Sequence, residues 1–536
     1  MKSSSRSKPH RGSYCKSKDL TLYPYQRAVA EWFKTHPHQK GMLIQFGTGT
    51  GKTLVAANLA EMMMQKGAVD GTLVIAPTSL VDNFYKAIRL CRGSTRVPSK
   101  YLVETYGRIV NMVEGRQKGL TKDPKQRESF YKKYPDAGWL RTKALRETLL
   151  VIDEAHNLKN VSSKRTKAIL KLARDAKHVL LLTATPFVNS VSDISPLMHM
   201  IVKDSDLRLW PAQEKLFRGT YQNRNDKYKK ALGKNIAYHF SDDRGLKPKV
   251  VRHVHKVDLE KEQIQVIDGI RAEMGKAMGK LLRAYLREEQ IPTGANLAKL
   301  NAFLVRIRQA ANSLHGECGP KIKALVKKAM AGPKPAVVYS EFKGKGVEVV
   351  RDCLVKAGVD PKTIAYFHGS LSKKERSAIV NDYNDGKYDY LLITSAGSEG
   401  LSLKATRQVH VLEPFWNMAK ILQVLGRGVR VDSHGHLPPK DRRVDVSYWI
   451  SVVSDDEKKK RKASNDKDLT TLQPDVHVWA AAKRKEDEME ALSKVHKKVS
   501  IPLAFPKKVK KALSPPKRKK QPSRRFRKKP LRNSRE

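Results

Sequence analysis

The sequence predicts an α/β protein with two lobes, each built around a parallel β-sheet, and three observations lead to this prediction. The chain has 536 residues, whereas a single domain usually holds about 100 to 200. Short apolar runs alternate with amphipathic stretches, as buried parallel strands alternate with helices. These runs fall into two sets, separated by roughly 150 residues that lack them. We therefore expect two sheets with a connecting segment between them.

The apolar runs locate the expected strands. In the first lobe they are Gly41–Phe46, Thr72–Ala76, Leu149–Ile152 and His178–Thr183. In the second lobe they are Ala336–Ser340, Thr363–Phe367, Tyr390–Thr394, Gln408–Glu413 and Val444–Ile450. The segment between the lobes is rich in Lys, Glu, Leu and Ala at helical spacing, most clearly over Leu259–Glu289, which predicts a helical insertion.

The chain then divides into six expected parts. They are a basic disordered arm (1–19), the first lobe (20–204), the helical insertion (205–320), the second lobe (321–455), a charged helical extension (456–496) and a basic disordered tail (497–536). The tail holds 17 Lys or Arg against one acid, and its prolines and few apolar residues leave it unable to build a core. Its run Pro516–Lys520 suits a nuclear-import signal or any polyanion-binding segment, and the sequence leaves both open.

The charge of the whole chain points to a polyanionic partner. Lys and Arg number 106 against 53 Asp and Glu, a formal charge of +53. So much like charge opposes a compact fold unless a polyanion lies against it, so nucleic acid is the first partner to expect. Hydrophobic residues make up 40%, which excludes wholesale disorder despite a mean hydropathy of -0.55.

The sequence disfavours two other classes of protein, those built on cysteine sites and those that span a membrane. The four cysteines, Cys15, Cys91, Cys318 and Cys353, are too widely spaced for a zinc knuckle and do not suit a disulfide scaffold. No run reaches the ~18 apolar residues that a membrane span needs, so we expect an intracellular protein without a membrane partner.

A nucleotide-binding loop follows the first expected strand. It reads Gly47, Thr48, Gly49, Thr50, Gly51, Lys52, Thr53 and leads into a helical stretch. Glycines let backbone N–H groups turn toward phosphate oxygens, the lysine neutralises the β- and γ-phosphates, and the last hydroxyl can contact Mg²⁺. Phe46 stands where the strict pattern has its first glycine, yet strand, loop and helix together predict an ATP site.

A second motif, Asp153, Glu154, Ala155, His156, ends the third expected strand. A carboxylate at the end of a parallel strand beside a phosphate loop can hold Mg²⁺ through water. We expect Asp153 to take this role together with Thr53, and Glu154 to activate the attacking water as the general base.

At this point the chain resembles the superfamily 2 helicases and translocases of the DEAD/DEAH type. The loop with its preceding phenylalanine fits that family, and Leu22–Gln26 (LYPYQ) resembles its Q-motif, in which Gln26 would read the adenine edge. The alternative, less favoured, is that Gln26 is an ordinary helix-start residue. Ala76–Leu80 resembles the backbone-contacting motif Ia, and Thr183–Pro186 resembles motif III, which couples the ATP site to the nucleic-acid track.

The second lobe carries the remaining motifs. Ser340–Phe342 resembles motif IV, Thr394–Leu401 resembles motif V, and Gln423–Arg430 (QVLGRGVR) matches motif VI. The resemblance implies that Gln423 lines the nucleotide site and that Arg427 and Arg430 act on the γ-phosphate as fingers in cis. Independently of the family, arginines three residues apart share one face of a helix and can converge on one anion.

Within the superfamily, the chain resembles the chromatin-remodeller-like branch. Four features carry this likeness: LYPYQ, RQAANS at Arg308–Ser313, the long interlobe segment and SEGLSL. The likeness extends to the nucleoside triphosphatases and early-transcription ATPases of large DNA viruses. It implies two tandem RecA-like lobes, ATP and Mg²⁺, transcription-machinery partners, and residence in the nucleus or cytoplasm of an infected cell or in the virion. DNA is the favoured substrate. An RNA helicase, or a non-catalytic protein of nucleic-acid packaging or transcription architecture, stays open as an alternative.

Overall fold

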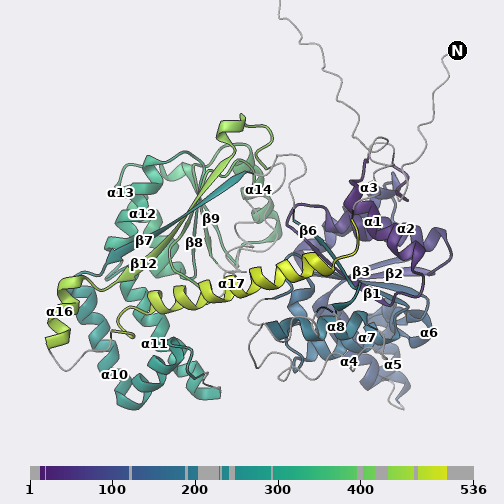
Figure 1. The fold of residues 1–536 in the computed structure, drawn as a ribbon, viewed down its shortest axis with the longest axis horizontal. Coiled ribbons are helices and arrows are strands. Elements are labelled where there is room, and N and C mark those ends of the chain that lie inside the picture. Colours follow the sequence, from purple (N-terminus) through teal and green to yellow (C-terminus); the bar gives the residue numbers. More distant parts are fainter. Residues whose placement is uncertain are drawn as a thin grey trace, which may run out of the picture.

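The computed structural model describes residues 13–17, 20–119, 123–187, 191–202, 229, 232–240, 248–290, 292, 294–394, 403–416, 433–463 and 469–503. Two six-stranded sheets form the centres of two lobes, and every strand pair in both sheets is parallel (Figure 1). The predicted α/β architecture with tandem RecA-like lobes is therefore confirmed. No helix of the described part is long and apolar enough to cross a membrane.

The first sheet has the strand order β3-β2-β4-β5-β1-β6. Its strands are β1 (Gly41–Phe46), β2 (Gly71–Ala76), β3 (Tyr101–Thr105), β4 (Thr148–Asp153), β5 (His178–Thr183) and β6 (Ile236–His239). Helices α1 (Pro24–Thr35), α2 (Lys52–Gln65) and α3 (Val81–Arg92) pack on one face of this sheet. Helices α4 (Tyr106–Gly119), α7 (Lys164–Asp175) and α8 (Ser195–Ile201) pack on the other. The central strands are buried on both faces, which explains their continuous apolar runs.

The second sheet has the strand order β7-β12-β11-β8-β10-β9. Its strands are β7 (Lys249–Asp258), β8 (Ala336–Ser340), β9 (Ile364–Phe367), β10 (Tyr390–Thr394), β11 (Gln408–Val411) and β12 (Arg443–Val452). The helices around it are α10 (Lys261–Leu286), α11 (Gly294–Asn312), α12 (Pro320–Ala331), α13 (Glu348–Lys356), α14 (Lys373–Asn384) and α16 (Asp455–Ala463).

The expected helical insertion is only partly helical. Helices α10 and α11 lie in it, but β6 joins the first sheet and β7 joins the second. Strand β7 is an edge strand whose side chains alternate between exposed and half-buried positions. Its apolar residues do not follow this alternation, since Val250 and Val254 are exposed, so a search for apolar runs overlooks the strand. The boundary between the two lobes therefore falls within the predicted insertion, since β6 belongs to the first sheet and β7 to the second.

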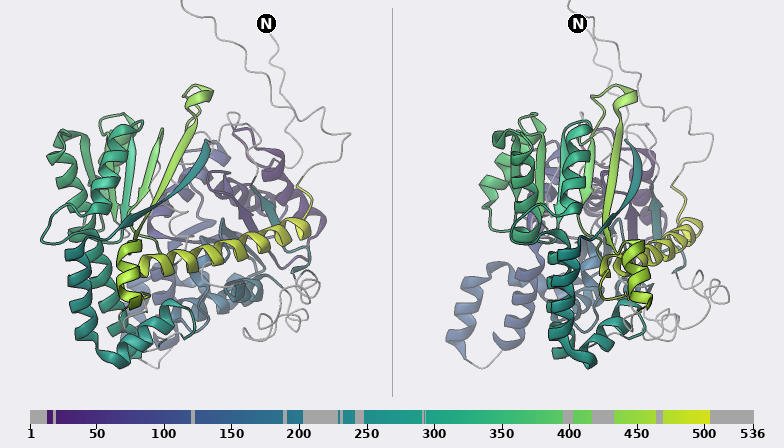
Figure 2. Two further views of the ribbon diagram at one scale, coloured as in Figure 1. Left: turned by 60° about the vertical axis from the view of Figure 1, so that its left-hand side comes forward. Right: turned by 90° about the vertical axis from the view of Figure 1, so that its left-hand side faces the viewer.

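Helix α17 (Pro474–Val499) links the two lobes. Figures 1 and 2 show it running from the second lobe to the first, and its 26 residues span about 39 Å at 1.5 Å per residue. Near its start, Val478 and Ala482 are buried in cores of the second lobe. Near its end, Leu492 and Val495 are buried in a core of the first lobe. The predicted charged extension is thus a structural connection between the lobes.

The predicted tail begins too early. Lys497 and Lys498 lie in α17, and the segment beyond the helix packs on the first lobe as far as Leu503. There Ile501 donates a backbone hydrogen bond to Ile236 on β6 (2.8 Å). The prediction of disorder is wrong for residues 497–503, because their apolar side chains complete a core; the rest of the predicted tail lies outside the described residues.

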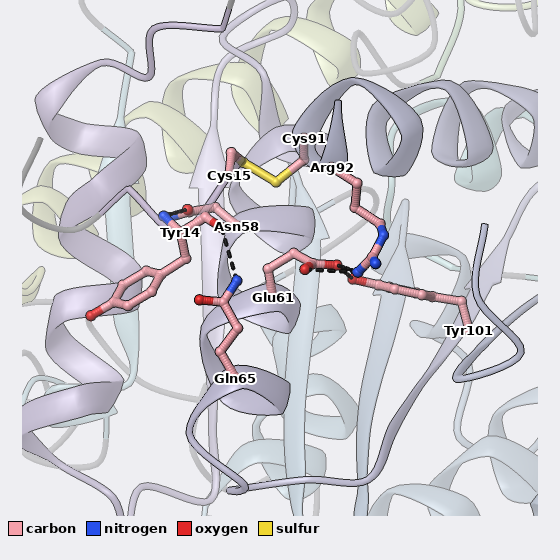
Figure 3. The surroundings of a disulfide bond; sticks show 8 residues. All are labelled: Tyr14, Cys15, Asn58, Glu61, Gln65, Cys91, Arg92 and Tyr101. Carbon is pink, nitrogen blue, oxygen red and sulfur yellow. Dashed lines mark hydrogen bonds and ion pairs between the residues drawn. A yellow bond between two sulfur atoms is a disulfide. The ribbon is translucent and has the colours of Figure 1, made fainter. Parts of the chain in front are cut away.

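The prediction that the cysteines do not suit disulfides is also wrong, since all four of them form disulfides. Cys318 pairs with Cys353 in the second lobe, and Cys15 pairs with Cys91 at the end of α3. The disulfide between Cys15 and Cys91 fastens residues 13–17 of the predicted disordered arm to the first lobe (Figure 3). Sequence spacing does not reveal these pairs, because the partners lie 76 and 35 residues apart and meet only through tertiary folding.

Candidate functional site

The phosphate loop lies between the end of β1 and the start of α2. Gly49 and Gly51 have φ angles of 78° and 82°, the left-handed region in which glycine is favoured. A Cβ on Gly51 would lie 2.4 Å from Gln26 Nε2, so a larger side chain there would displace the Gln26 amide from the loop. The loop therefore turns tightly enough for its N–H groups and the start of α2 to face one anion.

Side chains of the loop fold back on it. Lys52 Nζ donates to the carbonyl oxygens of Phe46 (3.2 Å) and Gly47 (3.5 Å). The Thr50 hydroxyl donates to Gly47 O at 2.7 Å. Thr53 follows in the first turn of α2. The lysine ammonium thus lies over the loop, where the sequence predicts the phosphates.

Helix α1 braces the loop from the side. Gln26 Nε2 donates to Thr50 O (2.9 Å), and Gln26 Oε1 accepts from the N–H of Tyr23 (2.9 Å). The Tyr25 hydroxyl donates to the same Thr50 carbonyl at 3.0 Å. Gln26 is therefore the helix-start residue of α1 and also contacts the loop, while its contact with the adenine edge stays a prediction.

The end of β4 brings Asp153 and Glu154 to the same edge of the sheet as the loop. Asp153 Oδ1 accepts from the N–H of Glu154 (2.9 Å), and Glu154 adopts a left-handed conformation with φ of 49°. The buried Tyr106 hydroxyl donates to Asp153 O at 2.6 Å. Burial, together with the charges of Asp153 and Glu154, raises the pKa of Tyr106, which keeps the hydroxyl protonated as a donor.

Hydrogen bonds join this motif to the end of β5. His156 Nδ1 lies 3.0 Å from Thr183 Oγ1 and 3.4 Å from Glu154 Oε2. Thr183 Oγ1 also accepts from the N–H of Thr185 at 3.1 Å. The hydroxyl of Thr183 therefore connects the predicted ATP-hydrolysing residues to the predicted motif III. Ala155, between them, is fully buried.

The donor set suits a metal held mainly by other ligands. The predicted Mg²⁺ residues offer one hydroxyl, from Thr53, and one carboxylate, from Asp153, which is 4% exposed. Within the described residues, no three His, Cys, Asp or Glu side chains gather as a metal cage. Mg²⁺ commonly binds through one or two protein oxygens with phosphate and water completing its octahedron, so these residues fit it.

In the second lobe, motif IV is part of a buried polar network. Glu413, which follows β11, accepts hydrogen bonds from Ser340 Oγ (2.8 Å), from the N–H of Glu341 (3.1 Å) and from Asn312. Burial outweighs the nearby cations and raises the pKa of Glu413. Asn312 of RQAANS is thus connected to motif IV through Glu413, a connection that the sequence alone did not predict.

The same network anchors the start of α17. Asp475 is buried and pairs with Arg308 Nε (3.0 Å) and Lys321 Nζ (2.9 Å). Burial alone would raise the pKa of Asp475, but the charges of Lys321 and Arg308 outweigh it and lower this pKa. A buried carboxylate with two cationic partners fixes the base of the helix in the second lobe.

The predicted motif VI lies outside the described residues. This applies to Gln423, Arg427 and Arg430, and to motif V beyond Thr394. Their predicted roles stay predictions. The residues that the structure brings together are those of the first lobe: Gln26, Lys52, Asp153, Glu154 and His156.

Two groups at this site were not predicted from the sequence. His239 and Phe240, at the end of β6, contact the loop: Gly47 N donates to His239 O at 2.9 Å, and the Phe240 ring lies beside Gly47. On β1, Gln45 contacts Ser493 (3.4 Å) and His496 of α17. Both contacts join residues more than 190 positions apart, so no local pattern could reveal them.

Comparison with protein families agrees with this geometry. Residues 19–188 match the model described as type III restriction enzyme, res subunit, residues 132–313 match the SNF2-related domain, and residues 320–432 match the helicase conserved C-terminal domain. Together they cover both lobes.

Proteins of similar sequence include viral proteins named as a helicase and a termination factor, and their similarity extends over most of this chain. A protein of Acanthamoeba polyphaga mimivirus, named as an ATP-dependent RNA helicase, is 32% identical over 484 residues, which are 86% of this chain and 95% of the relative. A termination factor NPH-I homolog of African swine fever virus is 25% identical over 77% of this chain and 70% of its own length. The chain therefore belongs to the superfamily 2 helicases, in the SNF2-related branch with the viral transcription ATPases, and is a nucleic-acid-dependent ATP hydrolase.

Proposed function

We propose that this chain is an ATP-driven translocase that moves along duplex DNA, and that it serves transcription or genome handling of a large DNA virus. The observation that carries the proposal is the path of contacts from Glu154 to Thr185: Glu154 Oε2 lies 3.4 Å from His156 Nδ1, and hydrogen bonds join that His156 nitrogen to the Thr183 hydroxyl and the Thr183 hydroxyl to the N–H of Thr185. This path joins the hydrolytic residues to motif III, which the resemblance assigns to coupling the ATP site with the nucleic-acid track.

The roles of the site residues follow from their positions. Lys52 would neutralise the β- and γ-phosphates, while Thr53 and Asp153 would hold Mg²⁺, which withdraws charge from the phosphate oxygens. Glu154, beside Asp153, would accept the proton of the attacking water. Arg427 and Arg430 would complete the site from the second lobe when the lobes close.

DNA is favoured over RNA by the SNF2-related match and by the termination-factor relative. The name of the mimivirus relative favours RNA. Exposed Thr78 and Ser79, which follow β2 at the same edge of the sheet, are suited to phosphate contacts. Contacts of this kind carry no base information, as a motor that steps over any sequence requires.

The deciding experiment compares ATP hydrolysis by the full chain with duplex DNA, single-stranded DNA and RNA of equal length. We expect duplex DNA to stimulate hydrolysis most, and Lys52→Ala to abolish it. Greater stimulation by RNA would establish the RNA helicase instead. Absence of phosphate release with every nucleic acid would favour the non-catalytic architecture protein.

The coupling path has its own test. Thr183→Val keeps the shape of the side chain but removes the hydroxyl, whereas Thr183→Ser keeps the hydroxyl. We expect the valine variant to retain basal hydrolysis and to lose most of its stimulation by nucleic acid, and the serine variant to keep both. Equal loss of basal and stimulated rates in the valine variant would make Thr183 a merely structural residue.

A further inference from the structure

Five aromatic or imidazole rings surround the phosphate loop, and their exposure differs. They belong to Tyr23, Tyr25, Phe46, His239 and Phe240. Tyr25 is 8% exposed and lies between Tyr23 (ring centroids 5.6 Å apart) and His239 (3.7 Å). Phe46 is fully buried and packs edge-on against Tyr25 and His239.

Phe240 differs from this packed cluster. It is 39% exposed, one of few large apolar side chains of the described residues that face solvent to this extent. Two of its ring carbons lie 3.4 and 3.8 Å from the position of a Cβ on Gly47, so the ring stands beside the first residue of the loop. Packing within the lobe uses only part of this ring, which meets the ring of Tyr238 at 4.9 Å in a tilted arrangement.

The position of Phe240 is well defined by its neighbours. His239 O accepts from the N–H of Gly47 (2.9 Å), which ties the end of β6 to the loop. On the other side of β6, Tyr238 N donates to Ser500 Oγ (2.9 Å) and Ile236 O accepts from Ile501 N (2.8 Å). The segment after α17 therefore holds β6, and with it Phe240, against the loop.

The strand order gives the bound nucleotide a direction. In the first sheet, β1 lies between β5 and β6, and β4 lies beyond β5. Asp153 and Glu154 end β4 and Thr183 ends β5, so the γ-phosphate must point toward that side of the loop. The nucleoside then extends to the opposite side, where β6 ends and α1 begins.

We propose that Phe240 is the stacking platform for the base of the bound nucleoside triphosphate. This inference rests on the proposed ATPase function and names a residue that determines nucleotide affinity at the same site. An exposed ring face gains free energy from any planar base, because every base has a π-face.

The test separates stacking from support of the loop. Phe240→Ala and Phe240→Leu both remove the π-face, and the leucine keeps an apolar side chain against Gly47. For both variants we expect KM for ATP to rise about tenfold with kcat unchanged. Inhibition by inorganic tripolyphosphate, which has no base, should be the same in both variants as in the native chain.

A third variant reports stacking without hydrolysis. Phe240→Trp should keep the native KM, and its added tryptophan emission, measured against the six native tryptophans, should fall on binding ADP but not tripolyphosphate. Weaker tripolyphosphate inhibition in step with the rise in KM would overturn the proposal, because the ring would then shape the loop. An unchanged KM in Phe240→Ala would overturn it as well.

These outcomes are distinguishable from failure of the proposed function. If the native chain did not hydrolyse ATP, quenching of the Phe240→Trp emission by ADP would still establish stacking. If it hydrolysed ATP and no quenching occurred, the base would lie elsewhere while the ATPase assignment stood.

Discussion

Glu154 is the residue whose chemistry the local geometry defines best. It follows β4 in a left-handed conformation that non-glycine residues rarely adopt, and such strained residues gather at functional sites. Its carboxylate lies 3.4 Å from His156, and the sequence predicts that it is the general base.

We predict that Glu154→Gln binds ATP with near-native affinity while kcat falls by about 10² to 10⁴, because the amide keeps the shape of the side chain and loses the base. Equilibrium binding of a fluorescent ATP analogue and phosphate release measure the two quantities. Lys52→Ala is the matched comparison, since it should lose affinity as well. If Glu154→Gln lost binding and turnover to the same degree, Glu154 would support the loop instead.

Among the described site residues, the sequence predicted where the loop and DEAH residues lie, and their catalytic roles stay predictions. The loop residues and the DEAH residues lie together because each motif follows directly on a strand whose carboxyl end faces the same edge. Phe240 and the partners of Gln45 escaped prediction because they reach the site from β6 and α17, through contacts that no local pattern encodes.

Among the elements, the buried strands of both sheets were predicted closely, since a strand covered on both faces needs a continuous apolar run. The strands missed were β3, β6 and β7, which are edge strands or short. An edge strand is covered less completely, so its sequence carries a weaker pattern. The helix after the loop was predicted, whereas the role of α17 as a connection was not.

The segment 13–17 adds a covalent constraint to helices α2 and α3. Its Cys15 is bonded to the buried Cys91, and Tyr14 N donates to Asn58 Oδ1 (2.7 Å) on the loop helix (Figure 3). Gln65 at the end of the same helix donates to Tyr14 O at 3.1 Å. The segment therefore clamps the loop helix at two points.

We predict that Cys15→Ser makes trypsin cleave faster after the exposed Lys16, whose N–H is held by Cys91 O at 2.7 Å. A disulfide that closes 76 residues stabilises the fold by about 4 kcal/mol on the chain-entropy model, so thermal unfolding should also begin at a lower temperature. A thiol reductant also opens Cys318–Cys353, so the control is the local cleavage alone: the reductant should speed cleavage after Lys16 in the native chain and leave that cleavage rate unchanged in the variant. Equal cleavage rates in all samples would mean that the hydrogen bonds alone hold the segment.

For the whole molecule, α17 is the feature that joins the ATP site to the second lobe. Asp475 fixes one end among cations of the second lobe, and His496 contacts Gln45 one residue before the loop-preceding Phe46. His496 is fully buried, and burial lowers its pKa to about 3. It is therefore neutral in the folded protein at any ordinary pH.

This burial makes stability depend on pH. Between the ordinary pKa of 6.5 and the folded value of about 3, the unfolded chain binds a proton at His496 that the folded chain does not. The contribution of neutral His496 to the free energy of unfolding is complete above pH 6.5 and is lost as the pH falls toward 3. We predict that lowering the pH from about 7.5 to 5.5 costs the native chain about 1 kcal/mol more than it costs His496→Gln, in denaturant unfolding curves. Equal losses in both proteins would mean that His496 is accessible to protons in the folded state.

The last prediction concerns where the chain can be shortened. Residues 500–503 hold β6 against β1, since Ile501 and Ser500 both bond to its backbone and Leu503 packs on the adjoining core. A chain that ends at Leu503 keeps this support of β6 but lacks 15 Lys or Arg of the native protein. We expect it to bind DNA more weakly and with a flatter salt dependence, the slope falling by roughly 0.9 for each phosphate that the tail no longer neutralises, while hydrolysis at saturating DNA is unchanged.

A chain that ends at His496 lacks the support of β6 as well, so we expect it to unfold at a lower temperature and to hydrolyse ATP more slowly even at saturation. ATPase assays and thermal melts of the two chains measure the difference. Identical behaviour would mean that β1 alone holds β6 and the phosphate loop in place.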